Sequence, residues 1–365
     1  MRWLAVPCLC AALGAPLSVG AQEAATAVYV RTDSDETTVI TPRLRVKAPV
    51  GTRTSAQLVY TVDVWTSASI DIRTSASLAV TEQRDELDVT LEHELDGVRL
   101  SADYRYSTEP DYESHGGSVA AEVDLANKSA TVAASASANF DDVGRVGDPL
   151  FSEDVQAVSG RLSLTQILDP DTLVQGVYQL TRTEGYQASP YRYVGIGSDD
   201  GTCEGLDVPC IPEANPELRV AHAFALRGRR ALSEVFSVGG SYRLYLDDWS
   251  MMSHTLQVDG GAWLDAATLV ALRYRLYLQN GAEHYQPSYD ELEEGRAFYT
   301  RDKELSPLSA HRVGLDLTRN WELDASGQVL STVLSVGPTF YSYSDYRLLD
   351  SVTAFEVTLT GALTL

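Results

Sequence analysis

The stretch Leu269–Gly281 reads LVALRYRLYLQNG, and its alternating pattern decides the fold. From Val270 to Leu278 every second residue is valine, leucine or tyrosine, and arginines occupy positions between them. Successive side chains of a β-strand point to opposite faces, so this period of two predicts a strand with one apolar face. That face requires either a protein core or, in an outer-membrane barrel, the surrounding lipid.

Similar runs recur almost to the end of the chain, separated by residues that favour turns. Helical periodicity is scarce. The pattern predicts sixteen strands, near Thr26–Asp33, Thr37–Lys47, Thr52–Val62, Leu78–Glu94, Val98–Ser107, Glu113–Leu125, Lys128–Phe140, Val155–Ile167, Thr172–Arg182, Leu218–Arg230, Val235–Asp247, Met252–Leu264, Thr268–Gln279, Ala310–Leu323, Gln328–Tyr343 and Ser351–Leu365.

The connections between these runs alternate in length. One series is tight and includes the hairpin signal Asp96-Gly97. The other is mostly longer and includes Asp63–Ser77, Asp141–Asp154, Thr183–Glu217 and Asn280–Ser309. Transmembrane barrels show this asymmetry, with short turns toward the periplasm and long loops outside, whereas a soluble sandwich has no reason to keep it. We therefore expect an all-β fold, an antiparallel up-and-down transmembrane β-barrel that leaves no strand edge in lipid.

Both ends of the chain fit export to the outer membrane. Residues 1–21 combine a basic residue, a short apolar run and small residues at the end, which predicts a cleaved signal peptide. The barrel is then one domain over residues 22–365. The last run, Phe355–Leu365, alternates strictly and resembles the terminal signal that the barrel assembly machinery recognises during insertion.

Composition narrows the classes of partner. The formal net charge of −23 argues against nucleic acid as a partner. Cys203 and Cys210 lie in a turn-rich stretch of a chain that we expect to be exported, so they predict a disulfide. No His or further Cys lies beside them for a metal site, and we expect no cofactor.

The division into two faces extends to other predicted strands. If the apolar face meets lipid, the opposite face lines the lumen. We expect the lumen to be lined by Arg99, Asp103, Arg105, Arg219, Arg227, Arg243, Asp247, Arg273 and Arg275. Rings of basic side chains can select anions. Alternatively, these arginines pair with lumen carboxylates such as Asp103, Asp247 and Glu356 and brace the wall.

Aromatic residues gather near the ends of the predicted strands. Five lie toward the predicted outer side and two nearer the short turns: Tyr104, Tyr106, Tyr242, Tyr341 and Tyr343, then Trp263 and Trp321. This distribution predicts two girdles at the membrane interfaces.

Several motifs resemble those of a known family. They are LDDWSMMSHT (Leu246–Thr255), RDKELSPLSAH (Arg301–His311), SPYRYV (Ser189–Val194), GRRAL (Gly228–Leu232) and VDVWTSASIDIRTSAS (Val62–Ser77). Together they resemble a bacterial outer-membrane β-barrel family of unknown function, domain of unknown function 3570. The motif residues include Asp247, Asp248, Trp249, Ser253, His254, Asp302, Lys303, Glu304, Ser306 and Pro307. The resemblance implies an exported barrel and no established activity.

The first motif contains the residue types of a hydrolase. Asp247, Ser253 and His254 could supply a catalytic triad. Ser253 and His254 are adjacent in a strand, however, so their side chains point to opposite faces. We favour a hairpin tip, with Asp247 and Asp248 in the turn, Trp249 at the membrane interface and local hydrogen bonds for the Ser and His. No catalytic residue is expected.

The loop before the second motif is strongly acidic. It contains Glu283, His284, Asp290, Glu291, Glu293 and Glu294, and Asp302-Lys303-Glu304 follows. Calcium prefers such oxygen ligands, but no ligand spacing is visible, so we favour a solvated loop held by internal ion pairs. The repeats Thr66–Ser69 and Thr74–Ser77 fit equally a constriction within the lumen and a flexible external loop.

Three functional hypotheses follow. The first is a porin-like channel for small polar or anionic solutes, with outer-membrane lipid around it. The second is a plugged barrel that docks an envelope protein or an exported polymer, motivated by the long loop Thr183–Glu217. The third is a hydrolase acting through His254, which we favour least.

Overall fold

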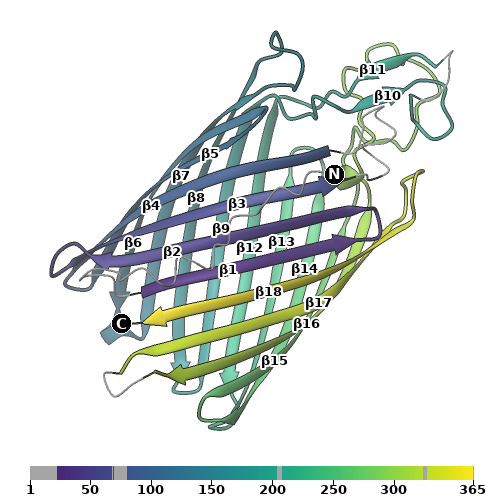
Figure 1. The fold of residues 1–365 in the computed structure, drawn as a ribbon. Coiled ribbons are helices and arrows are strands. Elements are labelled where there is room, and N and C mark those ends of the chain that lie inside the picture. The colour runs from purple at the N-terminus through teal and green to yellow at the C-terminus, as the bar shows by residue number, and fades with distance from the viewer. Residues whose placement is uncertain (1–22, 68, 70–79, 204–207, 324–326, 365) are drawn as a thin grey trace, which may run out of the picture.

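The chain forms one closed antiparallel β-barrel with a small two-stranded sheet beyond one rim (Figure 1). The computed structural model describes residues 23–67, 69, 80–203, 208–323 and 327–364. The predicted signal peptide and the repeat Thr74–Ser77 lie outside these residues.

Sixteen strands close the barrel, each paired with its neighbours along the chain, and β1 pairs with β18 to complete the ring. The strands are β1 (Glu23–Asp33), β2 (Thr37–Pro49), β3 (Thr54–Ser67), β4 (Val80–Leu95), β5 (Val98–Glu109), β6 (Tyr112–Leu125), β7 (Ala130–Val143), β8 (Glu153–Asp169), β9 (Thr172–Gly185), β12 (Leu218–Ala231), β13 (Phe236–Asp247), β14 (Met252–Asp265), β15 (Thr268–Gln279), β16 (Leu308–Glu322), β17 (Val329–Tyr343) and β18 (Ser351–Thr364). The small sheet pairs β10 (Tyr193–Gly195) with β11 (Cys210–Pro212), and 3-10 turns in the described residues cover Ala126–Lys128 (η2) and Lys303–Leu305 (η3). The predicted fold class is confirmed.

The two ends of the barrel differ as the connection lengths predict. One end, the short-turn end, carries the described termini and only short connections. One of these turns is Asp96-Gly97, where Gly97 adopts a φ of 78° that suits a two-residue hairpin. The other end, the long-loop end, carries residues 186–203, 208–217 and 280–307.

The polar face of the sheet is the concave, inner face. Strand neighbours lie about 4.8 Å apart, so away from the turns side chains two strands apart meet most easily where the wall curves toward them. Three ion pairs on the polar face skip a strand in this way: Lys47–Glu92 from β2 to β4 at 2.5 Å, Arg229–Asp259 from β12 to β14, and Arg312–Glu356 from β16 to β18. Two others, Arg230–Asp169 and Arg319–Asp265, skip a strand on the opposite face, but both lie beside short hairpin turns. Residues directly opposite each other on paired strands point to the same face of the sheet. The strand register therefore identifies the inner-face residues of every strand of the barrel.

The outer face is apolar and open. Leu272 is 59% exposed and Leu226 is 64% exposed, and both belong to a belt of large apolar side chains around the barrel. Water-soluble proteins rarely expose such a surface, so this belt suits lipid. No helix in the described part of the chain is long and apolar enough to cross a membrane.

The aromatic girdles are present only in part. Tyr104 and Tyr242 lie on the outer face toward the long-loop end, and Trp321 is 48% exposed near the short-turn end. Tyr341 and Tyr343 lie instead on the inner face, where Tyr343 packs against Leu308. The prediction for this pair was wrong because nearness to a strand end does not fix the face, which depends on parity along the strand.

Candidate functional site

The two long loops fold together into one unit, which we call the cap (residues 186–203, 208–217 and 280–307). Ile196 forms a bridge with Tyr289, and Ala214 forms one with Tyr299. Val194 joins Ile196, Tyr289 and Tyr299 in a cluster in which no side chain is more than 7% exposed. The predicted disulfide Cys203–Cys210 is confirmed within the first loop, with the Cα atoms 5.7 Å apart. The cap therefore has its own small core.

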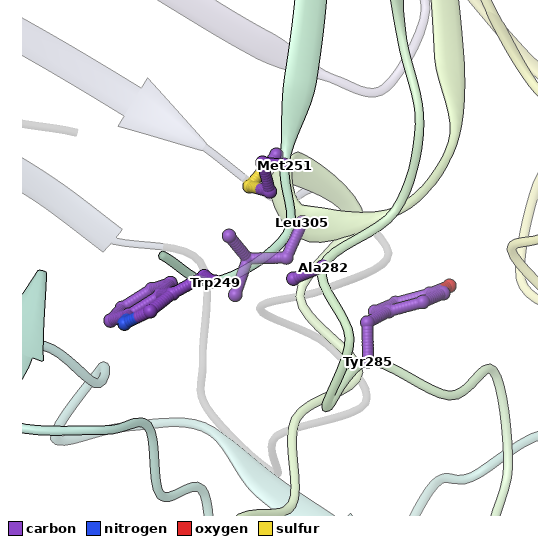
Figure 2. Packing of buried hydrophobic residues seen from close by; sticks show 5 residues of the cluster. All are labelled: Trp249, Met251, Ala282, Tyr285 and Leu305. Carbon is purple, nitrogen blue, oxygen red and sulfur yellow. The ribbon is translucent and has the colours of Figure 1, made fainter. Parts of the chain in front are cut away.

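A second cluster joins the cap to the turn between β13 and β14. Figure 2 shows its side chains: Trp249, Met251, Ala282, Tyr285 and Leu305. Trp249 is only 4% exposed, so its predicted place at the membrane interface was wrong. Its indole N–H donates to the carbonyl of Leu218 at 3.0 Å, and the Arg219 guanidinium lies 4.3 Å over its ring. The ring therefore packs under the cap rather than against lipid.

Asp247 shapes the turn that carries Trp249. Its Oδ1 accepts the backbone N–H groups of Trp249 and Met251, both at 3.0 Å. Its Oδ2 pairs with Arg219 at 2.6 Å and accepts the Tyr245 hydroxyl at 2.7 Å, and its side chain is fully buried. Asp248 accepts the backbone N–H of Val220 at 2.9 Å. Asp247, predicted to line the lumen, therefore organises the rim.

The motif Arg301–His311 fastens the cap to the inner wall. Asp302 accepts the N–H of Glu304 at 2.9 Å and so caps η3. The Ser306 hydroxyl donates to the carbonyl of Lys303 at 2.6 Å. Gln279, the last residue of β15, donates to the carbonyls of Glu304 and Ser306 at 2.7 and 2.8 Å. Pro307 packs close to Gly281: a Cβ on this glycine would lie 3.1 Å from the proline ring.

A chain of contacts runs through the cap from one part of the rim to another. The Tyr191 hydroxyl donates to Asp111 in the turn between β5 and β6. The next residue, Arg192, pairs with Asp302 at 2.8 Å. Lys303 then pairs with Asp35, in the turn between β1 and β2, at 3.0 Å. We call this chain of contacts the rim bridge.

The cap contains the buried Glu213 and the half-buried His284, two titratable groups whose surroundings shift the pKa. The Glu213 carboxylate pairs with Arg192 at 3.0 Å and accepts the Thr300 hydroxyl, and its burial raises the pKa. His284 Nε2 lies 2.9 Å from Asn215 Oδ1, joining the two loops. Burial lowers the pKa of His284, and the charges of Arg219 and Arg296 lower it further.

The structure places all seven predicted arginines on the inner face, but they differ in their partners. Four are paired with carboxylates: Arg99 with Glu122 at 2.7 Å, Arg105 with Asp88 at 2.8 Å, Arg219 with Asp247 at 2.6 Å and Arg273 with Asp316 at 2.6 Å. Asp103 accepts the Thr90 hydroxyl at 2.9 Å. Within the described ranges, Arg227, Arg243 and Arg275 have no carboxylate at ion-pair distance, and Arg243 lies 5.5 Å over the Tyr245 ring.

Two of these unpaired arginines belong to one cross-strand row. The register aligns Gln175, Arg227, Ser241, Gln257, Arg275, Arg312 and Thr339 from β9 to β17. Arg275 and Arg312 are direct neighbours, which would repel, but Glu356 neutralises Arg312. Arg275 lines a cavity of about 230 Å³ with Arg312, Tyr341 and the cap residue Glu304. Positive charge therefore persists in the wall beneath the cap.

The residues of the hydrolase hypothesis do not come together. Ser253 is 4% exposed on the inner face, and His254 lies on the outer face with its Nδ1 2.6 Å from the Tyr242 hydroxyl. The strand therefore separates the serine from the histidine, as its parity predicts.

The acidic residues that precede Arg296 in the second long loop are exposed, and an internal ion pair holds the loop. Glu293 pairs with Arg296 at 3.1 Å, and Arg296 lies 4.8 Å over the Tyr289 ring. Across the described residues, the carboxylates close enough to share an ion are Glu82, Glu109 and Asp111, which belong to β4, β5 and the following turn. Sequence reasoning missed this group because cross-strand pairing, not nearness in the chain, brings it together.

A family model matches residues 74–157 and 151–348, and its family is described as "Protein of unknown function (DUF3570)". These matches cover more than half of the chain, so the chain belongs to this family. A comparison with curated protein sequences finds no match.

Solved structures share the fold at low sequence identity. The chain is similar to a bacterial polysaccharide outer membrane secretin at 9% identity, with a TM-score of 0.52, covering 94% of this chain and 98% of that one. It also matches opdK, an outer membrane protein from Pseudomonas aeruginosa, at 8% identity with a TM-score of 0.47, covering 95% and 99%. CdiB from Acinetobacter baumannii matches at 9% identity with a TM-score of 0.49, covering 93% and 60%. The first of these likenesses supports the fold of an outer-membrane β-barrel.

Proposed function

We propose that this barrel is a porin-like channel for small anionic solutes, entered at the long-loop end beside the cap. The observation that carries the proposal is Arg275, an inner arginine that no carboxylate of the described residues neutralises and that lines the cavity under the cap. A guanidinium facing water attracts anions and binds carboxylate or phosphate groups by paired hydrogen bonds.

Neighbouring charges support this assignment. Arg273 lies on the same face two residues away, but Asp316 pairs with it at 2.6 Å. The wall thus uses most of its arginines for bracing and leaves Arg227, Arg243 and Arg275 without such partners among the described residues. These three belong to β12, β13 and β15, so this stretch of the wall carries positive charge.

The test is single-channel recording of the refolded chain in a planar bilayer under a salt gradient. We expect steady openings with a reversal potential that favours anions. Arg275→Gln should lower the anion-to-cation permeability ratio about two- to threefold. One unit charge at roughly 7 Å in water changes the anion and cation energies by about 0.6 kcal/mol each, in opposite directions, and salt at about 0.1 M halves both changes.

The matched control removes a neutral pair from the same wall. Arg273→Gln combined with Asp316→Asn leaves the net charge unchanged, so the permeability ratio should stay at the wild-type value. A reversal potential that ignores Arg275→Gln, or that shifts equally in the control, would contradict the proposal.

A capped anchoring barrel is the second candidate, and the rim bridge favours it. Contacts from Tyr191 to Asp111 and from Lys303 to Asp35 fix the cap at separated points of the rim. An inserted barrel that stays silent in the bilayer and co-purifies with a stoichiometric envelope partner would support this candidate over the channel.

A further inference from the structure

Four cross-strand Tyr–His pairs repeat around the outer face of the barrel. In each, the tyrosine hydroxyl lies at hydrogen-bond distance from Nδ1 of the histidine. The pairs are Tyr104–His115 at 2.8 Å, Tyr178–His222 at 3.0 Å, Tyr242–His254 at 2.6 Å and Tyr274–His311 at 2.8 Å. Four of the six histidines in the sequence belong to these pairs, so most histidines of this protein take part in the arrangement.

The pairs share one geometry and one level. Each tyrosine lies diagonally across from its histidine, because His254 is opposite Leu244 while Tyr242 is opposite Leu256, and the same offset recurs in the other pairs. The histidines are the third to fifth residues of β6, β12, β14 and β16, counted from the long-loop end. The pairs therefore mark the border between the apolar belt and the long-loop rim. We call them the Tyr–His girdle.

We assign the tyrosine hydroxyl as the donor in each pair, which makes Nε2 the outward donor of each histidine ring. A phenol that faces an apolar surrounding must donate its proton, because leaving it unsatisfied costs free energy. Nδ1 is the acceptor within reach, so the imidazole proton lies on Nε2. Each pair thus presents an Nε2–H group away from the tyrosine.

Three of these donors have no protein partner among the described residues. The exception is His115, whose Nε2 lies 3.2 Å from Glu113. His222, His254 and His311 make no further hydrogen bond to any part of the chain that the structure describes. Beside His222, Arg182 adds a cationic group on the same face, 54% exposed and paired with Glu184 at 2.6 Å.

We propose that the Tyr–His girdle binds the phosphate groups of outer-leaflet lipid headgroups. The apolar belt below it holds acyl chains, and the three Nε2–H donors lie where the headgroups begin. A phosphate is the strongest hydrogen-bond acceptor at that level, and it accepts from several donors at once. The proposal concerns the outer face and stands independently of the proposed channel.

The test compares two lipids that differ only in phosphate. The refolded chain in a maltoside detergent, which carries no phosphate, is mixed with dioleoyl phosphatidic acid or with dioleoylglycerol, and retained lipid is counted by native mass spectrometry. We expect the wild-type chain to retain phosphatidic acid roughly fivefold better, as expected for one net hydrogen bond. The triple variant His222→Phe, His254→Phe, His311→Phe should lose this preference.

His93→Phe is the matched control. His93 also lies on the outer face, but at the short-turn end of β4, where its Nδ1 bonds to Thr54 at 2.9 Å. This variant should keep the full preference for phosphatidic acid. Resistance to unfolding in cold SDS verifies that each variant is folded, and single variants replace the triple variant if it is not.

Two results would overturn the proposal. One is equal retention of the two lipids by the wild-type chain, which would reduce the girdle to an apolar contact. The other is a triple variant that is folded and still prefers phosphatidic acid. A dimer that forms without lipid selectivity would show that a second copy of the chain, rather than lipid, covers this face.

Discussion

The carboxylate of Asp247 holds the turn between β13 and β14, one of the places where the cap packs against the barrel. It satisfies two backbone N–H groups of a turn in which Ser250 adopts a positive φ of 62°, and it neutralises Arg219. The side chain of Asp247 is fully buried and that of Arg219 is 24% exposed. Removing one partner therefore leaves the other charge unpaired and poorly solvated, which costs free energy.

Asp247→Asn should therefore destabilise the junction between the cap and the turn by about 3 kcal/mol. Hydrogen exchange at the amides of Trp249 and Met251 measures this loss directly. Asp259→Asn is the control, because its partner Arg229 is 52% exposed, and we expect a cost below about 1 kcal/mol. Equal losses in the two variants would show that burial of the pair at Asp247 has no energetic consequence.

At the scale of elements, strands were predictable from the sequence and the cap was not. Each strand of the barrel is an alternating run bounded by turn residues, so local information located all of them. The cap depends on contacts such as Tyr191 with Asp111 and Lys303 with Asp35, which join residues from distant parts of the chain. No periodicity records such contacts.

The same limit explains the error at Trp249. A tryptophan at a hairpin tip near a membrane has the composition of an interfacial anchor. Only the approach of Leu305 and Ala282 from another loop makes its surroundings a core. Likewise, the sequence predicted that Arg227, Arg243 and Arg275 face the lumen. It could not predict that they lack carboxylate partners, because that depends on which side chains the strand register places beside them.

The cap should loosen in acid because of His284. Its pKa in the folded cap is lowered, so the open cap binds the proton more readily. The stability contributed by neutral His284 is complete above the ordinary histidine pKa of about 6.5 and declines as pH falls below that value. The groups around it act in both directions: Arg219 and Arg296 disfavour its charge, whereas Asp247 and Glu283 favour it.

Hydrogen exchange of residues 280–307 between pH 7.5 and 5.5, corrected for intrinsic rates, measures this loosening. His284→Gln can still donate to Asn215 but does not titrate, so its cap should change less over this range. The raised pKa of Glu213 makes the cap more stable as pH falls, which opposes the effect of His284. Glu213 is present in both proteins, so the difference between their exchange profiles reports on His284. Identical profiles for the two proteins would assign the pH dependence to another group.

At the scale of the whole molecule, the rim bridge decides between a channel and a closed anchor. Lys303 pairs with Asp35 across the ends of β16, β17 and β18, so this contact holds the second long loop over the lumen. If the barrel conducts, the cap limits entry at this point. Lys303→Gln removes the tether while leaving the strands untouched, and we expect the single-channel conductance to rise.

Arg296→Gln controls for charge in that experiment. It removes one positive charge from the same loop, but its pair with Glu293 lies inside the cap and reaches no part of the rim. The conductance of this variant should stay near the wild-type value, whereas a rise equal to that of Lys303→Gln would mean that charge alone controls entry. Silence in all three proteins, with correct insertion verified, would exclude a cap that gates and leave the anchoring barrel as the function to pursue.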